Sequence, residues 1–132
     1  MADRVADLLL CAAARNSAAC VALVQAPGID DSIIGFHAQQ ACEKCLMAVL
    51  SAAGVEFRRT HDLVRLTSLL EASGYALPAI AQRIDVLNPF SVEGRYGLVD
   101  AGRLDRAMAL EAIDTIFAWA TATISPSPLA GP

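Results

Sequence analysis

Turn-forming residues divide the sequence into five segments, and within each segment the apolar residues recur at the three- and four-residue spacing of a helix face. We expect helices over residues 2–24, 31–53, 60–73, 78–87 and 102–124. The breaks between them contain Pro27-Gly28, Gly54, Gly74 and Asn88-Pro89, which favour turns or helix ends. No alternation of apolar and polar residues is long enough to indicate a strand. The sequence therefore predicts an all-α protein.

The lengths of the connections indicate how these helices are arranged. Most connections are short, which favours antiparallel neighbours, and only residues 88–102 form a long predicted loop. We expect an up-and-down antiparallel bundle of four main helices plus one short helix, forming a single domain over residues 1–124. The final residues 125–132, SPSPLAGP, contain three prolines and are predicted to be a flexible tail.

Charge and apolar content limit the location and the partners of the chain. The net charge is −4, so contact with a nucleic acid would require a local basic patch. The uncharged run at residues 45–55 is shorter than the roughly 20 residues of a membrane-spanning helix. Asp3 and Asp7 stand where a signal peptide is positive. We expect a cytoplasmic protein without membrane contact, with its four cysteines as reduced thiols.

The stretch FHAQQACEKCL, residues 36–46, contains a C-x-x-C pair formed by Cys42 and Cys45. Such a pair can indicate a zinc site or a redox dithiol. A redox dithiol begins a helix after a strand, and structural zinc needs four ligands, but this pair lies mid-helix and no second C-x-x-C or H-x-x-H exists. On a helical wheel both cysteines fall on the apolar arc. We expect them to pack in the core, and we expect no metal and no cofactor.

The opposite side of the same helix carries polar residues, namely His37, Gln39, Gln40, Glu43 and Lys44. They are interleaved with Phe36, Met47 and Ile33, which are unfavourable in water. Polar groups that are partly buried need one another as hydrogen-bond partners. We therefore favour a buried or interfacial polar network over a solvated face.

These residues also carry a resemblance to a known family. The matching residues are Phe36, His37, Ala38, Gln40, Ala41, Glu43 and Lys44, then His61, Asp62 and Leu63, and finally Arg95 and Tyr96. In order and spacing, over roughly residues 5–122, the chain resembles the HEPN domain (higher eukaryotes and prokaryotes nucleotide-binding).

The resemblance implies a helical bundle that pairs as a homodimer. Prokaryotic members are often encoded beside a minimal nucleotidyltransferase, with which they form a toxin–antitoxin-like module. Some members are RNases that use an R-x(4–6)-H motif at the dimer cleft, and others bind nucleotides. In this chain no arginine stands at that distance before His37 or His61. RNase activity is therefore not expected, and no catalytic residue is assigned.

The resemblance and the polar pattern together give the candidate residues for binding a nucleotide or RNA: His37, Gln40, Glu43, Lys44, His61, Asp62, Arg95 and Tyr96. For some of these residues a structural role is the alternative to ligand binding. The sequence Thr60-His61-Asp62 has the composition of a helix start, with Thr60 as the N-cap and Asp62 in the first turn. Arg95, between two glycines, either pairs with Glu43 or faces a phosphate or a base beside Tyr96.

Two further basic features have less definite interpretations. Arg58 and Arg59 are the only adjacent basic pair, and they could attract phosphate as a loop patch. Arg15 and Asn16 interrupt an alanine run and are expected to be exposed or to bridge helices.

Three functional hypotheses follow. The leading one is a HEPN-type homodimer that binds a nucleotide or RNA and acts as a regulatory partner of a minimal nucleotidyltransferase. The second is an RNase toxin that uses His61 and Arg95 in a dimer cleft. The third is a purely structural dimerising bundle, in which the polar cluster only sets the register of the helices.

Overall fold

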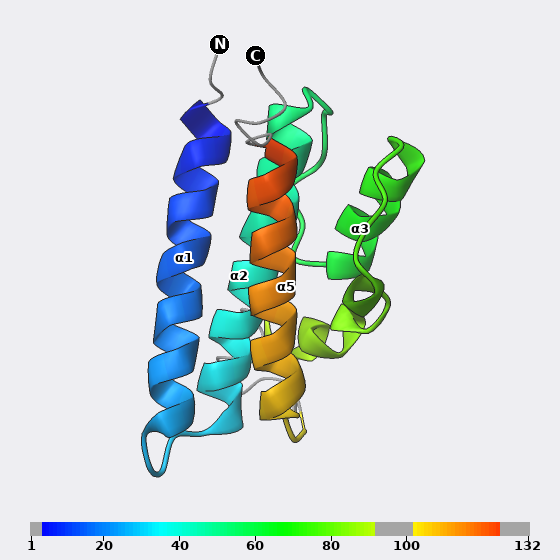
Figure 1. Cartoon of the computed structure of the whole chain (residues 1–132). Coiled ribbons are helices and arrows are strands. Elements are labelled where there is room, and N and C mark those ends of the chain that lie inside the picture. The colour runs from blue at the N-terminus through cyan, green and yellow to red at the C-terminus, as the bar shows by residue number, and fades with distance from the viewer. Residues whose placement is uncertain (1–3, 92–101, 125–132) are drawn as a thin grey trace.

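The computed structural model describes residues 4–91 and 102–124, and these residues form helices and no strand. The elements are α1 (Arg4–Gln25), α2 (Asp31–Ala52), α3 (Leu63–Ala72), two 3₁₀ helices, η1 (Ala79–Gln82) and η2 (Ile84–Phe90), and α5 (Arg106–Ile124) (Figure 1). The prediction of an all-α bundle is confirmed. The predicted tail, residues 125–132, and most of the predicted long loop lie outside the described residues.

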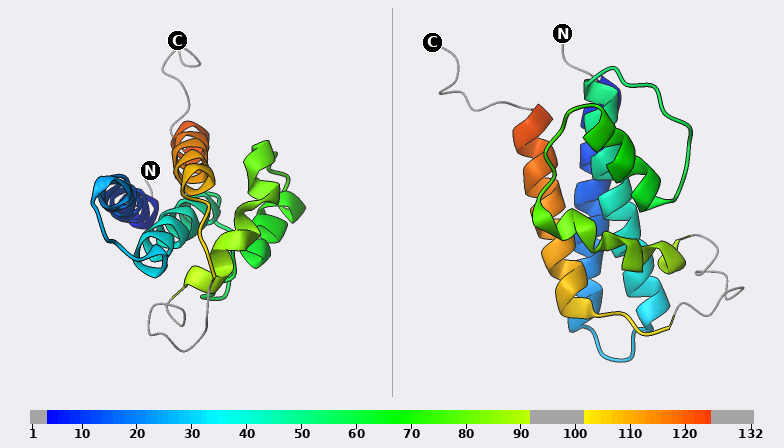
Figure 2. Two further views of the ribbon diagram at one scale, coloured as in Figure 1. Left: turned by 90° about the horizontal axis from the view of Figure 1, so that it is seen from below. Right: turned by 90° about the vertical axis from the view of Figure 1, so that its right-hand side faces the viewer.

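Helix α2 occupies the centre of the bundle. Viewed along its axis, α2 has α1 and α5 on one side and α3 with the two 3₁₀ helices on the other (Figure 2). Helices α1 and α2 form an antiparallel hairpin, whereas α2 and α5 run in the same direction because the segment from α3 to η2 returns the chain to the lower end (Figure 1).

An ion pair holds the parallel helices together at their N-terminal ends. The Arg106 Nε atom lies 2.8 Å from Asp31 Oδ1, and the backbone N–H of Leu104 donates to Asp31 Oδ2 at 3.0 Å. These bonds from Leu104 and Arg106 lower the pKa of Asp31 below its usual range.

The ends of α2 are those that the sequence predicts. The side chain of Asp30 accepts a hydrogen bond from Ser32 N at 2.8 Å, as an N-cap does. At the other end, Gly54 has a φ of 71°, a left-handed conformation that only glycine adopts without strain. The backbone N–H of Val55 then returns to Leu50 O at 3.0 Å and closes the helix.

The predicted start of the third helix is wrong by two residues. Asp62, not Thr60, is the N-cap of α3, and it accepts from Val64 N at 3.0 Å. The Thr60 Oγ1 atom accepts from Asp62 N instead. Asn88, distant in sequence, donates to Asp62 Oδ1 and accepts from Leu63 N. This tertiary contact selects the cap, and it leaves His61 outside the helix.

The fourth predicted helix is also different in detail. It consists of two 3₁₀ helices, and the second continues through Asn88 and Pro89 to Phe90 rather than ending before them. The last helix begins at Arg106 instead of near residue 102, because Asp105 Oδ1 accepts from Met108 N at 3.0 Å and sets its first turn.

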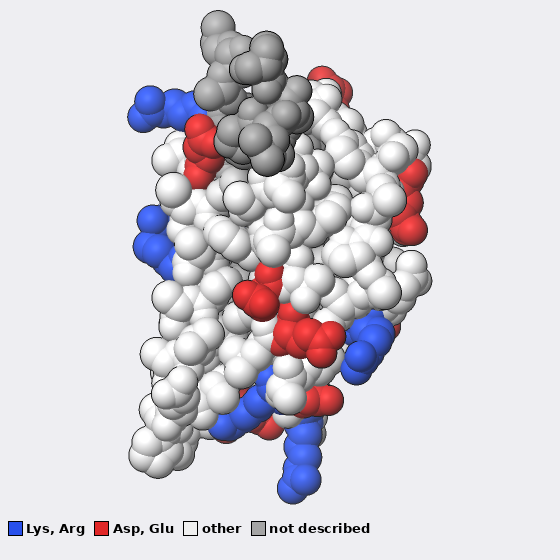
Figure 3. Space-filling view, viewed as in Figure 1, with Lys and Arg blue, Asp and Glu red and all other residues white. Residues whose placement is uncertain are grey.

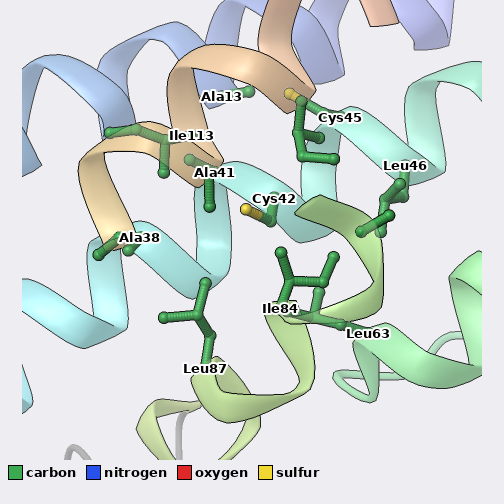
Figure 4. Packing of buried hydrophobic residues seen from close by; sticks show 14 of the residues in the cluster. Ala13, Ala38, Ala41, Cys42, Cys45, Leu46, Leu63, Ile84, Leu87 and Ile113 are labelled. Carbon is green, nitrogen blue, oxygen red and sulfur yellow. The ribbon is translucent and has the colours of Figure 1, made fainter. Parts of the chain in front are cut away.

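The hydrophobic core surrounds α2, with 14 of its 22 residues buried. Side chains from α3, η2 and α5, including Leu63, Ile84, Leu87 and Ile113, converge on its cysteines and alanines (Figure 4). Gly35 lets η2 approach closely, because a Cβ atom at this position would overlap the ring of Phe90.

Helix α1 is covered on one side only. Its buried residues are Ala6, Ala13 and Cys20, whereas Val5 and Leu8 are more than half exposed. The face that Figure 3 shows, with α1 and α5 toward the viewer, is largely uncharged.

By length and composition α1 and α5 could each cross a membrane, but core helices and signal sequences meet the same criterion. The expected cytoplasmic location thus remains a prediction.

Candidate functional site

The C-x-x-C pair lies inside the core. Cys42 and Cys45 are 0% and 1% exposed, and their neighbours are the core side chains of Figure 4. Burial raises the pKa of both thiols, that of Cys45 to about 12. The predicted packing role is confirmed. Within residues 4–91 and 102–124, no three His, Cys, Asp or Glu side chains are grouped so that they could hold a metal.

The other side of α2 carries the polar residues, and they form two hydrogen-bonded networks. The first, which we call the loop-side network, joins Gln39, Gln40 and Glu43 to His61 in the connection before α3. Gln39 Nε2 donates to Glu43 Oε1 and to His61 O, both at 3.0 Å, while Gln39 Oε1 accepts from Gln40 Nε2 at 2.7 Å. Glu43 Oε1 also lies 2.8 Å from His61 Nδ1. This network ties α2 to the residues that precede α3.

Burial differs sharply across the loop-side network. Gln39 is 0% exposed, and the Glu43 side chain is 6% exposed. The His61 side chain is 49% exposed, so the carboxylate holds the ring from inside while the other ring edge faces outward. A buried carboxylate on Nδ1 fixes the orientation of an imidazole ring.

The second network, the α1-side network, connects α2 to α1. Asn16 lies between two α2 residues one heptad apart: its Nδ2 is 3.1 Å from His37 Nδ1, and its Oδ1 accepts from Lys44 Nζ at 2.7 Å. Of the two expectations for Asn16, exposed or bridging helices, the structure shows the second. Phe36 packs edge-on against the His37 ring, with centroids 5.4 Å apart.

Lys44 differs electrostatically from the rest of the cluster. Its partner is a neutral amide, and no carboxylate in the described part of the chain lies within ion-pair distance of its ammonium group. Burial lowers its pKa; the charge of Glu43 opposes this, and Arg15 adds to it. The cluster thus contains a partly buried cation that is not paired with any carboxylate among residues 4–91 and 102–124.

The structure brings together five of the eight candidate residues: His37 and Lys44 in the α1-side network, and Gln40, Glu43 and His61 in the loop-side network. Asp62 stands apart from them as the cap of α3. Arg95 and Tyr96 lie outside the described residues, so their two proposed roles stay predictions.

Two residues are more central than the sequence indicates. Gln39 makes three of the hydrogen bonds of the loop-side network, and Asn16 links the two ends of the α1-side network. Neither belongs to the candidate set. The sequence places Gln39 on the polar side of its helix and Asn16 within an alanine run, but it does not indicate that they are the centres of the two networks.

Comparison with protein families gives one match. The family model of the HEPN domain matches residues 28–122, which include α2, α3, both 3₁₀ helices and most of α5. Neither the comparison with curated proteins nor that with solved structures gives a match. The match covers most of the chain and includes both the C-x-x-C helix and His61. The chain belongs to the HEPN family.

Proposed function

We propose that this HEPN protein is a binding and regulatory protein that associates with a nucleotide or RNA through the polar side of α2. The observation that carries the proposal is Lys44. Its ammonium group is held in place by Asn16 and has no carboxylate in ion-pair contact within the described residues. A positioned, partly buried cation is suited to a phosphate group.

The surrounding network supports this role by pre-organising the site. Gln39, Gln40 and Glu43 are buried and bonded to one another, so their rotamers are fixed before any ligand arrives. His37 and His61 lie in these networks and add imidazole groups that can donate to an anion. A pre-ordered site loses less conformational entropy on binding.

The proposal includes a homodimer in the cytoplasm and a minimal nucleotidyltransferase as partner. Family membership supports the nucleotidyltransferase and the toxin–antitoxin-like module. The exposed apolar side chains of α1 support the homodimer, since Val5 is 56% and Leu8 is 58% exposed, and such surface is commonly covered by a partner.

Binding of a fluorescent nucleotide and of a short labelled RNA, measured by anisotropy, tests the ligand. Lys44→Gln keeps a donor for Asn16 but removes the charge, and we expect it to weaken binding about tenfold. Arg4→Gln removes one exposed charge from the far end of α1 and serves as the matched control, with an expected change below about twofold. Equal effects of the two substitutions, or no binding by the unmodified protein, would contradict the proposal.

A second candidate function, RNA cleavage, is favoured by one contact. Glu43 Oε1 lies 2.8 Å from His61 Nδ1, and the histidine is half exposed. A histidine oriented by a buried carboxylate can transfer protons as a general acid or base. The cation that would stabilise the transferring phosphate was predicted to be Arg95, which lies outside the described residues.

Incubation of purified protein with RNA in the presence of a chelator distinguishes the two functions. The binding proposal expects intact RNA. Cleavage that is lost in His61→Ala and reduced in Glu43→Gln would instead establish the catalytic alternative. If neither RNA, nucleotide nor nucleotidyltransferase associates with the protein, the purely structural dimerising bundle remains.

A further inference from the structure

A separate pocket lies between the connection that follows α2 and the first turns of α3. It has a volume of about 460 Å³ and is lined by Phe57, Arg58, Arg59, Thr60, Arg65, Leu66 and Leu69. None of these residues belongs to the two networks of the α2 site. His61, which follows Thr60 directly, pairs with Glu43, so this pocket borders the loop-side network.

The pocket concentrates positive charge in a chain that is negative overall. Three of the ten lysines and arginines line it, although the chain carries a net charge of −4. Two of them, Arg58 and Arg59, belong to the connection, and Arg65 belongs to α3. Arginine presents its donors in a fork that matches the oxygens of a phosphate group.

Among the described residues, the only carboxylate paired with these arginines is that of Asp62. Within the described ranges, no ion pair involves Arg58 or Arg59. Arg65 is 74% exposed and approaches only Asp62, with Nε 3.9 Å from Oδ2. The other oxygen of Asp62 is engaged in capping α3 and in the bond from Asn88. Within the described part of the chain, Arg58 and Arg59 are therefore without an ion pair, and the largely exposed Arg65 has only this long contact, so an external anion can reach all three.

The pocket is also lined by apolar side chains. Phe57 is half-buried and packs against the core, as does Leu69, and Leu66 is 1% exposed. A planar ring anchored in this way offers a surface on which a nucleobase can stack, a contact that is independent of base sequence. The Thr60 hydroxyl accepts from Asp62 N, and its proton remains a donor.

We propose that this pocket binds a phosphorylated nucleoside, with phosphate on Arg58, Arg59 and Arg65 and the base against Phe57. The proposal rests on the proposed association with nucleotide or RNA, and adds to it a second contact region with its own residues. A pocket of this volume has the size of small-ligand sites. The same chemistry is offered by a free nucleotide and by a nucleotide within a single RNA strand.

Anisotropy with two probes tests the pocket in the full-length protein: a fluorescent ADP and a labelled decamer of oligouridine. We expect the double substitution Arg58→Gln/Arg59→Gln to weaken binding of at least one probe tenfold or more. For the decamer, the slope of log affinity against log salt should fall by about 1.4, since each single-strand phosphate contact contributes about 0.7. The control Arg4→Gln/Arg83→Gln removes two exposed arginines elsewhere and should change affinity less than threefold.

Phe57→Leu distinguishes a nucleoside site from a simple anion site. Leucine keeps the apolar packing but removes the ring, so we expect weaker binding of the probe with an unchanged salt slope. Equal affinity of Phe57→Leu and the unmodified protein, together with equal competition by inorganic pyrophosphate and by ADP, would overturn the nucleoside assignment. If the substitutions in the pocket weaken binding of the decamer alone, the ligand is an RNA strand. If they weaken binding of ADP alone, the ligand is a free nucleotide.

Comparison with Lys44→Gln separates this proposal from the function proposed above. If Lys44→Gln weakens binding and the arginine double variant behaves as its control, the pocket proposal is overturned and the α2 site stands. If instead the arginine double variant weakens binding and Lys44→Gln has no effect, the pocket proposal is supported and the proposed α2 site is contradicted. Far-UV circular dichroism and melting temperature verify folding, and because Arg58 and Arg59 are exposed, their substitution should leave both unchanged.

Discussion

Helices α1 and α2 both contain 22 residues, but α1 buries three of them and α2 buries 14. Their composition does not explain this difference, since each helix carries three charged residues. Helix α1 contains the run LLLCAAA and leaves Leu8 58% exposed, whereas α2 carries glutamines, a glutamate, a lysine and a histidine and lies in the centre of the bundle (Figure 2). Position within the bundle decides burial, and polar residues enter the centre when they can bond to one another.

The two helices also differ in how their faces are covered by the rest of the protein. On α2 the apolar arc packs against α3, η2 and α5, and the polar arc is satisfied by hydrogen bonds to Asn16 and His61. On α1 only Ala6, Ala13 and Cys20 are buried, a few larger side chains such as Leu9 and Leu23 are partly buried against the core, and Val5 and Leu8 are left to solvent or to a partner. The predictions below probe these differences, beginning with the largest expected effect.

The same substitution in the two helices should have very different effects on the free energy of unfolding. Leu46→Ala on α2 removes a side chain that is 0% exposed and should destabilise the protein by about 2–5 kcal/mol. Leu8→Ala on α1 should change stability by less than about 0.5 kcal/mol. Urea unfolding of both variants measures the contrast. Similar losses in both would contradict it, and a loss for Leu8→Ala that depends on protein concentration would locate the proposed dimer on α1.

Gly35→Ala tests the tight packing around α2. The added methyl group would overlap the ring of Phe90, so we expect a loss of about 1–3 kcal/mol, although alanine favours helices over glycine. The double variant Gly35→Ala/Phe90→Leu should lose less than the sum of the single variants, because the smaller side chain relieves the overlap. An increase in melting temperature for Gly35→Ala would show that η2 does not approach α2 this closely.

Substituting one glutamine in each helix compares the buried polar residues of α2 with the exposed ones of α1. Gln39→Leu leaves the Gln40 amide without its acceptor and removes a donor from Glu43, and should destabilise the fold by about 1–3 kcal/mol. Gln25→Leu, at the exposed end of α1, should change stability by less than about 0.5 kcal/mol. Chemical denaturation measures both. A neutral or stabilising Gln39→Leu would mean that the network contributes specificity rather than stability.

The N-terminal end of α2 should give a small pH dependence. The pKa of Asp31 is lowered by Leu104 N and Arg106, so the stabilisation exists above the unfolded-state pKa of about 4 and disappears as pH falls through the lower folded-state value. Asp31→Asn should lose up to about 1 kcal/mol at pH 7 and should show a weaker fall in stability between pH 4 and pH 2. A pH profile identical to that of the unmodified protein would exclude this contribution.

Thiol reactivity should differ between the helices without any change in stability. Cys11 on α1 is exposed, whereas Cys20, Cys42 and Cys45 are buried with raised pKa values. At pH 8 a disulfide reagent such as DTNB should modify one thiol rapidly in the folded protein and all four after denaturation. Cys11→Ser should abolish the rapid phase. Rapid reaction of a second thiol in Cys11→Ser would show that the C-x-x-C pair is accessible.

Local patterns in the sequence predict much of the fold correctly. Helical spacing locates α1, α2, α3 and the last helix, and Asp30 and Gly54 mark the ends of α2 because caps act within a few residues of the chain. The wheel places Cys42 and Cys45 on the core arc, since the angle between residues of one helix depends only on their separation. Family resemblance from short motifs is also confirmed.

The wrong start of α3 and the overlooked role of Asn16 both involve contacts between distant residues. Thr60 is a reasonable cap by composition, but Asn88 bonds to Asp62 and Leu63 and moves the start of α3. The importance of Asn16 depends on its position opposite His37 and Lys44, 21 and 28 residues away in sequence. No local pattern encodes such a distance, because it results from how α1 packs against α2.

The sequence by itself determines that the chain is helical, where most helices begin and end, and which arc of α2 is apolar, because these properties arise from neighbouring residues. Tertiary structure alone decides that α2 rather than α1 is central, that its polar arc is divided between Asn16 and His61, and that Lys44 is left without a paired carboxylate among the described residues. It also gathers Arg58, Arg59 and Arg65 around one pocket with Phe57. These features depend on which surfaces meet when the helices pack, and packing is a property of the whole chain.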